Sequence, residues 1–476
     1  MLARRLTLPS QAWLAASFAV VMSVWLGREA LTSPRITVAA AVGLVLAAIV
    51  LKRLLVGVVL FTIITFPSSL PSSFGIATLA KPLGLLLLFS WVLLLAARRQ
   101  DVSSLIRDHW VLAVGVISYM IWALLSASWA TDPTATLTSG SRLVQVVVLL
   151  FIVYSVVRTP SDLRVMAWTY LLAALATSGF ALATGVTSAG RITGGIVDPN
   201  FLAGEMVVAL VLGGFMLAIT TNWRTRLLLL GILTTCGAAF IRTQSREGVI
   251  ALLIAFLLAI LVAGPHRSRI VAMVLIVSAL GVTYYAKLAP ESLRVRITGI
   301  SSQDSAGRTD IWRLAARAGA RRPILGVGLG NFPVVSPRYV SSTTNLMSAQ
   351  YGLNGLVVHN TYLETFSELG LVGLALLVVT LGAALAAAGR GVRRLSPSDR
   401  QTSAIARGLI VGTVALLVQY TFVSAEYEKQ LWILLGLLAA IPAVVARAGE
   451  DSEEPREHGA DTTHSDELRL IGSTRT

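Results

Sequence analysis

The residues best suited to chemistry lie in one stretch of the chain, from Gly307 to Gly370. This stretch contains Arg308, a basic and glycine-rich run over residues 321–332, and the sequence His-Asn-Thr-Tyr-Leu-Glu over residues 359–364. Apolar runs long enough for lipid lie on both sides of it. We therefore expect these polar residues to act at a membrane surface.

His359 is the histidine best placed for catalysis, at the first turn of an expected helix. The other four fall in expected cytoplasmic turns or in the C-terminal tail: His109, His266, His458 and His464. An imidazole titrates near neutrality and suits a general base, and a helix start leaves backbone donors free for an anion. Asn360, Glu364, Ser367 and Glu368 follow at helical spacing as a polar stripe. The alternative is a histidine that makes only a structural hydrogen bond.

Several arginines stand at the ends of expected helices on the outer side of the membrane, where the positive-inside rule predicts few basic residues. Arg142 and Arg191 lie beside or between apolar runs, and Arg242 and Arg246 flank a helix break at residues 243–245. A guanidinium binds phosphate oxygens in pairs and remains charged, so a group of arginines would hold a pyrophosphate as it leaves. The alternatives are contacts with lipid phosphates, or salt bridges to neighbouring acids: Asp198, Glu205 and Glu247.

Metal and nucleophilic chemistry find little support. The sequence contains neither an Asp-x-Asp pair nor a His-x-x-x-His pair, and the close pair Glu426 and Glu428 can equally form a charge cluster with Lys429. No nucleophilic triad is recognisable, and Cys236 is a lone cysteine in an apolar run. We expect neither a metal nor another cofactor.

Composition identifies an integral membrane protein. The 476 residues are 55% hydrophobic and 13% charged, and the mean hydropathy is +0.75. Apolar runs predict an all-α polytopic bundle of about 12–14 transmembrane helices. They lie at 11–27, 36–51, 54–66, 76–97, 110–129, 139–157, 163–185, 199–220, 226–242, 246–263, 269–287, 359–388, 404–424 and 430–446.

The positions of arginine and lysine predict the orientation of the bundle. With the N-terminus in the cytoplasm, nearly every basic turn faces inside, and the segment 288–358 lies outside. We therefore expect a membrane bundle over residues 1–446 with a partly helical extracytoplasmic segment at 288–358. Residues 447–476, which are rich in acids, form an expected disordered cytoplasmic tail.

The extracytoplasmic segment has two recognisable parts. Residues 309–318 place apolar and basic side chains on different sides, which predicts a helix at the membrane interface that ends before Pro323. The glycines of residues 326–330 follow no predicted strand, so a dinucleotide fingerprint is rejected. A tight turn that approaches a ligand or a helix is the better interpretation.

Together these motifs resemble the O-antigen ligase and O-antigen polymerase superfamily of bacterial membranes. Residues 190–203 are similar to its Arg-x-x-Gly…Pro-Asn-x-x-Ala segment, and residues 243–248 resemble its Ser-Arg-Gly break with Glu247 inserted. Arg308 to Trp312, residues 322–332 and residues 359–373 resemble its signature region. The resemblance covers about residues 190–375.

The resemblance implies a C-type glycosyltransferase fold and a polyprenyl-diphosphate-linked glycan donor at the outer face of the plasma membrane. It implies transfer to an acceptor hydroxyl with inversion and without a metal. His359 would deprotonate or orient the acceptor, Arg191 and Arg246 would hold the diphosphate, Arg308 would assist, and Arg142 is a further candidate. Five motif residues would support the site or contact the acceptor: Asn200, Asn331, Asn360, Tyr362 and Glu364.

Three alternatives to a ligase remain at this point. A repeat-unit polymerase would share the donor chemistry and differ only in its acceptor. A transporter would export a lipid-linked anion without chemistry, and would need repeat symmetry and broken helices at the midplane. A structural scaffold would leave the polar stripe after His359 unexplained. None of these interpretations involves nucleic acid.

Overall fold

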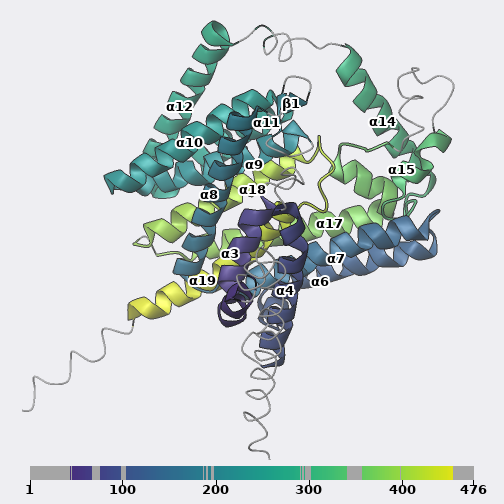
Figure 1. Cartoon of the computed structure of the whole chain (residues 1–476), viewed down its shortest axis with the longest axis horizontal. Coiled ribbons are helices and arrows are strands. Elements are labelled where there is room, and N and C mark those ends of the chain that lie inside the picture. Colours follow the sequence, from purple (N-terminus) through teal and green to yellow (C-terminus); the bar gives the residue numbers. More distant parts are fainter. Residues whose placement is uncertain are drawn as a thin grey trace, which may run out of the picture.

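The computed structural model describes an α-helical bundle over most of the chain (Figure 1). The described residues are 43–66, 76–97, 103–289, 302–339 and 356–453, without 44, 186, 189–190, 194–197 and 397, and with Glu291 and Arg294. The helices of the first half are α3 (Leu54–Thr65), α4 (Ile76–Ala96), α5 (Ser103–Asp108), α6 (Trp110–Leu125), α7 (Pro133–Val156), α8 (Pro160–Thr184) and α9 (Pro199–Ile219).

The second half is also helical. Its helices are α10 (Trp223–Thr243), α11 (Arg246–Val262), α12 (Arg267–Thr283), α14 (Ser302–Arg321), α15 (Phe332–Val335), α17 (Thr361–Arg393), α18 (Arg400–Gln419) and α19 (Lys429–Glu453). Short 3-10 helices occupy Ser126–Ser128, Gly264–His266 and Ser336–Tyr339, and a short π-helix occupies Tyr284–Leu288. Two short strands, β1 (Thr187–Ser188) and β2 (Arg191–Ile192), pair antiparallel.

The structure confirms an all-α polytopic membrane protein. Among the described residues, nine helices are long and apolar enough to cross a membrane. Each apolar run predicted from residue 54 onward corresponds to a helix, whereas the run at 11–27 and residues 36–42 and 44 of the run at 36–51 lie outside the described residues. The predicted boundaries differ most from the observed ones in two helices. The helix predicted at 139–157 begins at Pro133, and α19 continues to Glu453, past the predicted end at 446.

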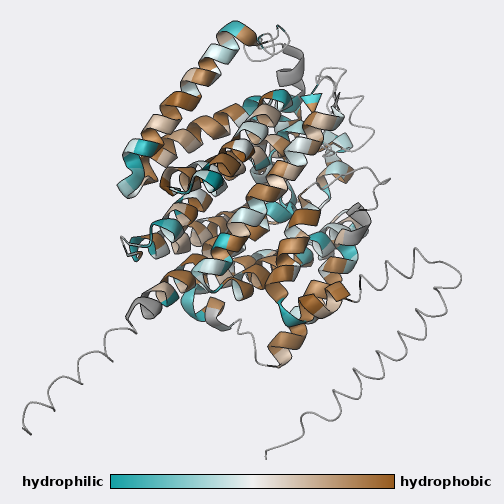
Figure 2. Cartoon of the chain, turned by 60° about the vertical axis from the view of Figure 1, so that its left-hand side comes forward, coloured by the Kyte–Doolittle hydropathy of each residue, from teal (hydrophilic) through white to brown (hydrophobic). Residues whose placement is uncertain are grey.

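Small residues bring the central helices α9 and α18 into close contact. α9 is the most buried of the candidate spans. A Cβ added to Gly408 would lie 3.1 Å from Leu212, and one added to Gly412 would lie 3.1 Å from Val208. Close approach of backbones supplies the packing that membrane helices need in the absence of a hydrophobic driving force. Figure 2 shows hydrophobic residues along the outer helices. In α11, Leu253, Leu257 and Leu261 are exposed.

Short polar side chains define where many helices begin. The side-chain oxygen of the residue before the helix accepts a backbone N–H of the first turn, which satisfies a group that lipid would leave unpaired. The helices capped in this way are α7, α8, α9, α10, α11, α17 and α18, by Asp132, Thr159, Asp198, Asn222, Ser245, Asn360 and Asp399 respectively.

Helix α17 is interrupted at Gly370, which has φ 69° and ψ −168°. The groups freed by this break have partners in other elements: Leu371 N–H donates to Pro323 O (2.7 Å), and the Trp122 indole N–H donates to Leu369 O (2.9 Å). A Cβ on Gly370 would lie 2.2 Å from Ile324 O. Only glycine therefore fits at this position, because the loop that follows α14 packs directly on the break.

The glycine-rich run of residues 326–330 is the segment that packs on this break. Val327 N–H donates to Ser367 O (3.0 Å) and Gly328 N–H donates to Glu368 O (2.8 Å). A Cβ on Gly326 would lie 2.3 Å from the backbone of Glu368. Of the two roles that the sequence allowed for these glycines, the structure shows approach to a helix.

Candidate functional site at one end of the bundle

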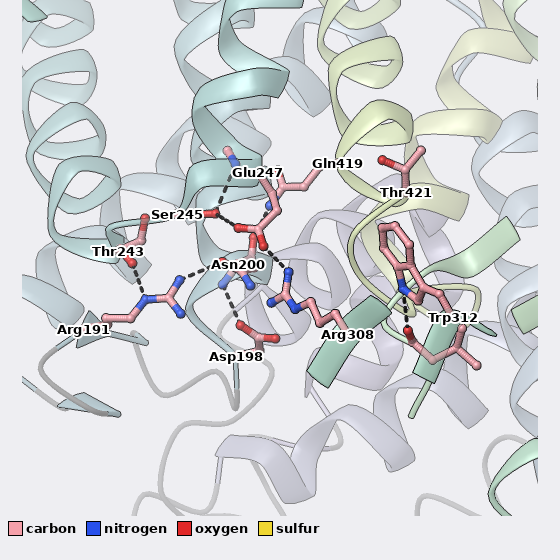
Figure 3. A network of polar contacts seen from close by, with 12 residues as sticks. Arg191, Asp198, Asn200, Thr243, Ser245, Glu247, Arg308, Trp312, Gln419 and Thr421 are labelled. Carbon is pink, nitrogen blue, oxygen red and sulfur yellow. Dashed lines mark hydrogen bonds and ion pairs between the residues drawn. The ribbon is translucent and has the colours of Figure 1, made fainter. Parts of the chain in front are cut away.

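Arg191 lies where β2, α9 and α10 meet (Figure 3). Its Nε donates to Thr243 O at the end of α10 (2.7 Å), and its Nη2 donates to Asn200 Oδ1 in the first turn of α9 (2.7 Å). The residue is 9% exposed. Asp198 caps the same turn by accepting Asn200 N–H (2.8 Å). The Arg191 guanidinium is therefore held in a fixed position by two helix ends.

The start of α11 presents a carboxylate to Arg308. The chain turns at Gln244, whose φ is 51°, and Ser245 Oγ then caps α11 by accepting Gly248 N–H (3.0 Å). Ser245 Oγ also donates to Glu247 Oε2 (3.2 Å). The other oxygen of Glu247 accepts from Arg308 Nη1 in an ion pair, to which the arginine points in Figure 3.

His359 occupies the turn that leads into α17. Its φ of 53° lies in the left-handed region, which non-glycine residues seldom adopt. The preceding carbonyl, Val358 O, accepts the indole N–H of Trp312 in α14 (3.0 Å). On the other side of the turn, Thr361, the first residue of α17, donates its N–H to Tyr420 O (2.9 Å). The strained turn is thus fixed on both sides by α14 and by the loop after α18.

We call Arg191, Asn200, Glu247 and Arg308, with the neighbouring Arg246, the arginine network. The charges of its members Arg308 and Glu247 act on His359. Burial and then the positive charge of Arg308 hold the pKa of His359 below its ordinary value of 6.5, while Asp198 and Glu247 oppose the shift. His359 is therefore within electrostatic reach of the residues around Arg191 and Arg308. Its imidazole is neutral at pH 7, which is the form that a general base requires.

The two other predicted arginines differ in their relation to this network. Arg246 is the first residue of α11, half-buried, and stands next to Glu247. Arg142 is exposed on α7, and the group on which its charge acts is Glu426. The structure therefore places Arg191 in β2 against the ends of α9 and α10, Arg246 at the start of α11 and Arg308 in α14. Of these arginines, the charge of Arg308 acts on His359, and Arg142 lies near a different carboxylate.

Asn331 has a structural position in the described part of the chain. It is fully buried; its Oδ1 accepts Asp132 N–H (2.7 Å) and its Nδ2 donates to Thr136 Oγ1 (2.9 Å). These contacts attach the glycine-rich run to the start of α7. In this arrangement Asn331 is a buried connector, and its predicted role as a residue that supports the site or contacts the acceptor stays a prediction.

Asn360 and Tyr362 also have structural partners. Asn360 caps α17 by accepting Leu363 N–H (2.9 Å). The hydroxyl of Tyr362 donates to Leu417 O (2.8 Å). Asn360 thus fixes the first turn of α17 and Tyr362 attaches that turn to α18, so both residues position the turn that carries His359.

Three buried carboxylates lie near one another beyond the first turn of α17. Glu364, Glu368 and Glu426 are each under 10% exposed and interact electrostatically. Glu368 accepts N–H groups of the glycine-rich run, from Gly330 (2.6 Å) and Phe332 (3.0 Å). In the loop after α18, burial raises the pKa of Glu426 to about 7. The predicted acceptor residue Glu364 thus belongs to a carboxylate cluster.

Sequence reasoning missed the position of Gln419. Its Nε2 donates to Asn200 O, so it supports the residue that holds Arg191. The available signal was a glutamine within the apolar run predicted at 404–424. The pairing of Arg308 with Glu247 was also not assigned, although Glu247 was named among the acids able to form a salt bridge.

The chemistry available here is that of guanidinium groups beside a neutral imidazole. Among the described residues, no group of three or more His, Cys, Asp or Glu side chains is placed to hold a metal ion. The positive charge that acts on His359 is that of Arg308. Such an arrangement can bind a phosphate-bearing anion and accept a proton from a neighbouring hydroxyl.

Comparison with known proteins gives one family match. Residues 229–378 match the family described as O-Antigen ligase. This segment contains Arg246, Arg308 and His359. No curated protein matches the chain. Among solved structures, one chain from "Structural coordination of polymerization and crosslinking by a peptidoglycan synthase complex" is 15% identical with a TM-score of 0.40. The match covers 70% of this chain and 97% of that one.

Proposed function

We propose that this chain moves a glycan from a polyprenyl-diphosphate carrier to a lipid or glycan acceptor, as a glycosyltransferase of the O-antigen ligase type; the family match over residues 229–378 supports this proposal. The transfer takes place on the outer face of a bacterial plasma membrane, with both termini of the chain in the cytoplasm. It inverts the configuration at the transferred sugar and uses arginines in place of a metal.

The donor diphosphate binds at the arginine network. Arg191 is held by Thr243 and Asn200, so its guanidinium is already in place before the ligand arrives. Arg246 and Arg308 add charge from the start of α11 and from α14. Fixed guanidinium groups bind phosphate oxygens in pairs and stabilise the charge that develops as the diphosphate leaves.

His359 acts on the acceptor. Its neutral imidazole takes the proton of an acceptor hydroxyl, whose oxygen attacks the anomeric carbon of the donor sugar. The bond between that carbon and the diphosphate oxygen breaks, and the electron pair leaves with the polyprenyl diphosphate. Attack from the face opposite the leaving group gives inversion. Burial and the charge of Arg308 favour the neutral imidazole before the reaction.

The observation that carries the proposal is the nearness of His359 to three charged residues. They are Arg308 in α14, Glu247 in the first turn of α11 and Asp198 at the start of α9. The charges of Arg308, Glu247 and Asp198 all act on the imidazole. A reaction between an anionic donor and a hydroxyl acceptor requires both functions within one site. The match to the ligase family favours this enzyme over an exporter or a scaffold.

The direct test uses the purified full-length protein in detergent with a lipid-linked oligosaccharide. We expect release of polyprenyl diphosphate together with a new glycoside, and the loss of both products with His359→Ala. Intact donor after prolonged incubation with acceptor would refute the proposal. A repeat-unit polymerase is the second candidate, because it shares the donor chemistry. It would lengthen the lipid-linked glycan when no other acceptor is present.

A further inference from the structure

A small polar cavity adjoins the arginine network and has no role in the proposed reaction. It lies between the start of α9, the end of α18 and the loop before α19, and its volume is about 10 Å³. Its polar walls are Asn200, Glu205, Gln419 and Glu428, together with Tyr420 and Gln430. This volume suits one occupant the size of a water molecule.

Two buried oxygen atoms in the wall of this cavity have no hydrogen-bond partner among the described residues. They are Glu205 Oε2 and Gln419 Oε1, from side chains that are 6% and 1% exposed. The donor end of the Gln419 amide is already engaged, because its Nε2 bonds to Asn200 O. Only the acceptor end of Gln419 is left for the cavity. A buried acceptor without a partner is costly, which points to an occupant that supplies positive charge or protons.

Two of the side chains that line the cavity are carboxylic acids and none is a cation. The charge of Glu428 acts on Glu205, and the charge of Lys429 acts on Glu428. Burial raises the pKa of Glu428. The hydroxyls of Tyr170 and Tyr420 are the other titratable groups that feel Glu205, and neither is a cation.

The number of oxygen ligands favours a monovalent ion. Calcium takes six to eight oxygens with several carboxylates, and magnesium demands near-octahedral geometry with retained waters. Two carboxyl groups and one amide oxygen around a water-sized space supply fewer oxygen ligands than either divalent ion takes. Because two neighbouring buried carboxylates repel each other, the favoured form has one carboxyl ionised and the other protonated, and this form balances a single positive charge.

We propose that this cavity binds a monovalent metal cation of the size of Na⁺, held by Glu205, Gln419 Oε1 and Glu428. The occupied site fixes the Gln419 side chain, and Gln419 in turn holds Asn200, whose Oδ1 accepts from Arg191. The cation therefore stabilises one wall of the arginine network without contacting the donor. The proposal does not depend on which glycan is transferred.

The test measures thermal stability of the full-length protein in detergent. Choline chloride is replaced stepwise by NaCl, LiCl or KCl at constant ionic strength. Because an ion that binds only the folded protein stabilises it by mass action, we expect the Tm to rise saturably by about 2 °C or more in NaCl. Glu205→Gln should lose this response. Glu291→Gln, at an exposed position, is the matched control and should retain it.

Three results would overturn the proposal. The first is a Tm that is equal in choline chloride and in all three metal salts. The second is a Na⁺ response that persists in both Glu205→Gln and Glu428→Gln. The third is stabilisation by MgCl₂ at lower concentration than by NaCl. If Glu205→Gln does not fold, Glu428→Gln supplies the same comparison from the opposite wall. The assay contains no donor or acceptor, so its failure leaves the glycosyltransferase proposal untouched.

Discussion

Arg308 and Glu247 form an ion pair that joins α14 to the start of α11, across 61 positions of sequence. The Arg308 side chain is 33% exposed and that of Glu247 is 13% exposed, so the pair lies at the boundary of the network. Glu247 thus occupies a guanidinium that the proposed donor site would use. An incoming diphosphate would have to displace this carboxylate or share the arginine with it.

Glu247→Gln should therefore tighten diphosphate binding. Removing the negative charge leaves Arg308 to the ligand, and a change of about 1–2 kcal/mol corresponds to roughly 5- to 30-fold in affinity. The measurement is inhibition of glycan transfer by inorganic pyrophosphate. Arg308→Ala should weaken inhibition, and in that background Glu247→Gln should have little further effect. Equal and additive effects in both backgrounds would contradict a shared guanidinium.

His359→Ala should abolish glycan transfer while membrane insertion and Tm remain close to wild type. Loss of a positioned general base typically costs about 10²- to 10⁴-fold in rate. His359→Asn keeps a polar side chain and tolerates the left-handed backbone at this position. It separates the loss of the base from strain in the turn. Transfer at the wild-type rate in both variants would remove His359 from the mechanism.

The transfer rate should fall as the pH is lowered through the pKa of His359. Burial and Arg308 hold that pKa below 6.5, so the neutral base predominates at pH 7 and is lost only at more acidic pH. We expect the acid limb of the kcat/KM profile to have its midpoint below 6.5. Arg308→Ala removes a positive charge near the imidazole and should move this midpoint upward. A downward movement would contradict the assigned electrostatics.

Arg246→Ala should weaken donor binding, because the variant removes one charge from the start of α11. Arg242→Ala is the matched control, since Arg242 is an exposed arginine in the last turn of α10. We expect the KM for the lipid-linked donor to rise at least several-fold in the first variant and to change little in the second. Equal KM values in both variants would exclude Arg246 from the donor site.

Gly370→Ala should destabilise the protein and reduce activity. A Cβ there would meet Ile324 O at 2.2 Å, and the φ of 69° disfavours alanine. Such strain costs about 1–3 kcal/mol. Gly382→Ala lies in the same helix with nothing within 4 Å of its added Cβ, and should be neutral or stabilising. The Tm in detergent compares the two; a lower Tm for Gly382→Ala would contradict the packing argument.

Hydropathy predicted the helices of this protein well because lipid imposes one simple rule. A backbone that crosses the membrane must satisfy its own hydrogen bonds, so apolar runs of sufficient length become helices. The start of α7 was missed because its first turns, Pro133 to Ser139, are polar and extend beyond the apolar run. The break at Gly370 was also not predicted, because the apolar pattern continues through it.

The site was predicted in its residue types more than in its contacts. Positive charge at helix ends indicated Arg191 and Arg246, the resemblance to the ligase superfamily added Arg308, and a histidine at a helix start indicated His359. Which carboxylate meets Arg308 depends on how α14 packs against α11, and no periodicity encodes that packing. Tertiary packing also decides the partners of Asn331 and Arg142. The side-chain oxygen of Asn331 accepts the N–H of Asp132 at the start of α7, and the charge of Arg142 acts on Glu426.

The interruption of α17 divides that helix into two bodies with separate attachments. The short body begins beside His359 and is bonded to α14, to the glycine-rich run and to the loop after α18. The long body, from Leu371 to Arg393, crosses the bundle. Gly370 therefore separates a segment whose direction is set by the loops bonded to it from a segment whose direction is set by packing in the bundle. The orientation of the turn that carries His359 is thus independent of the direction in which the long body runs.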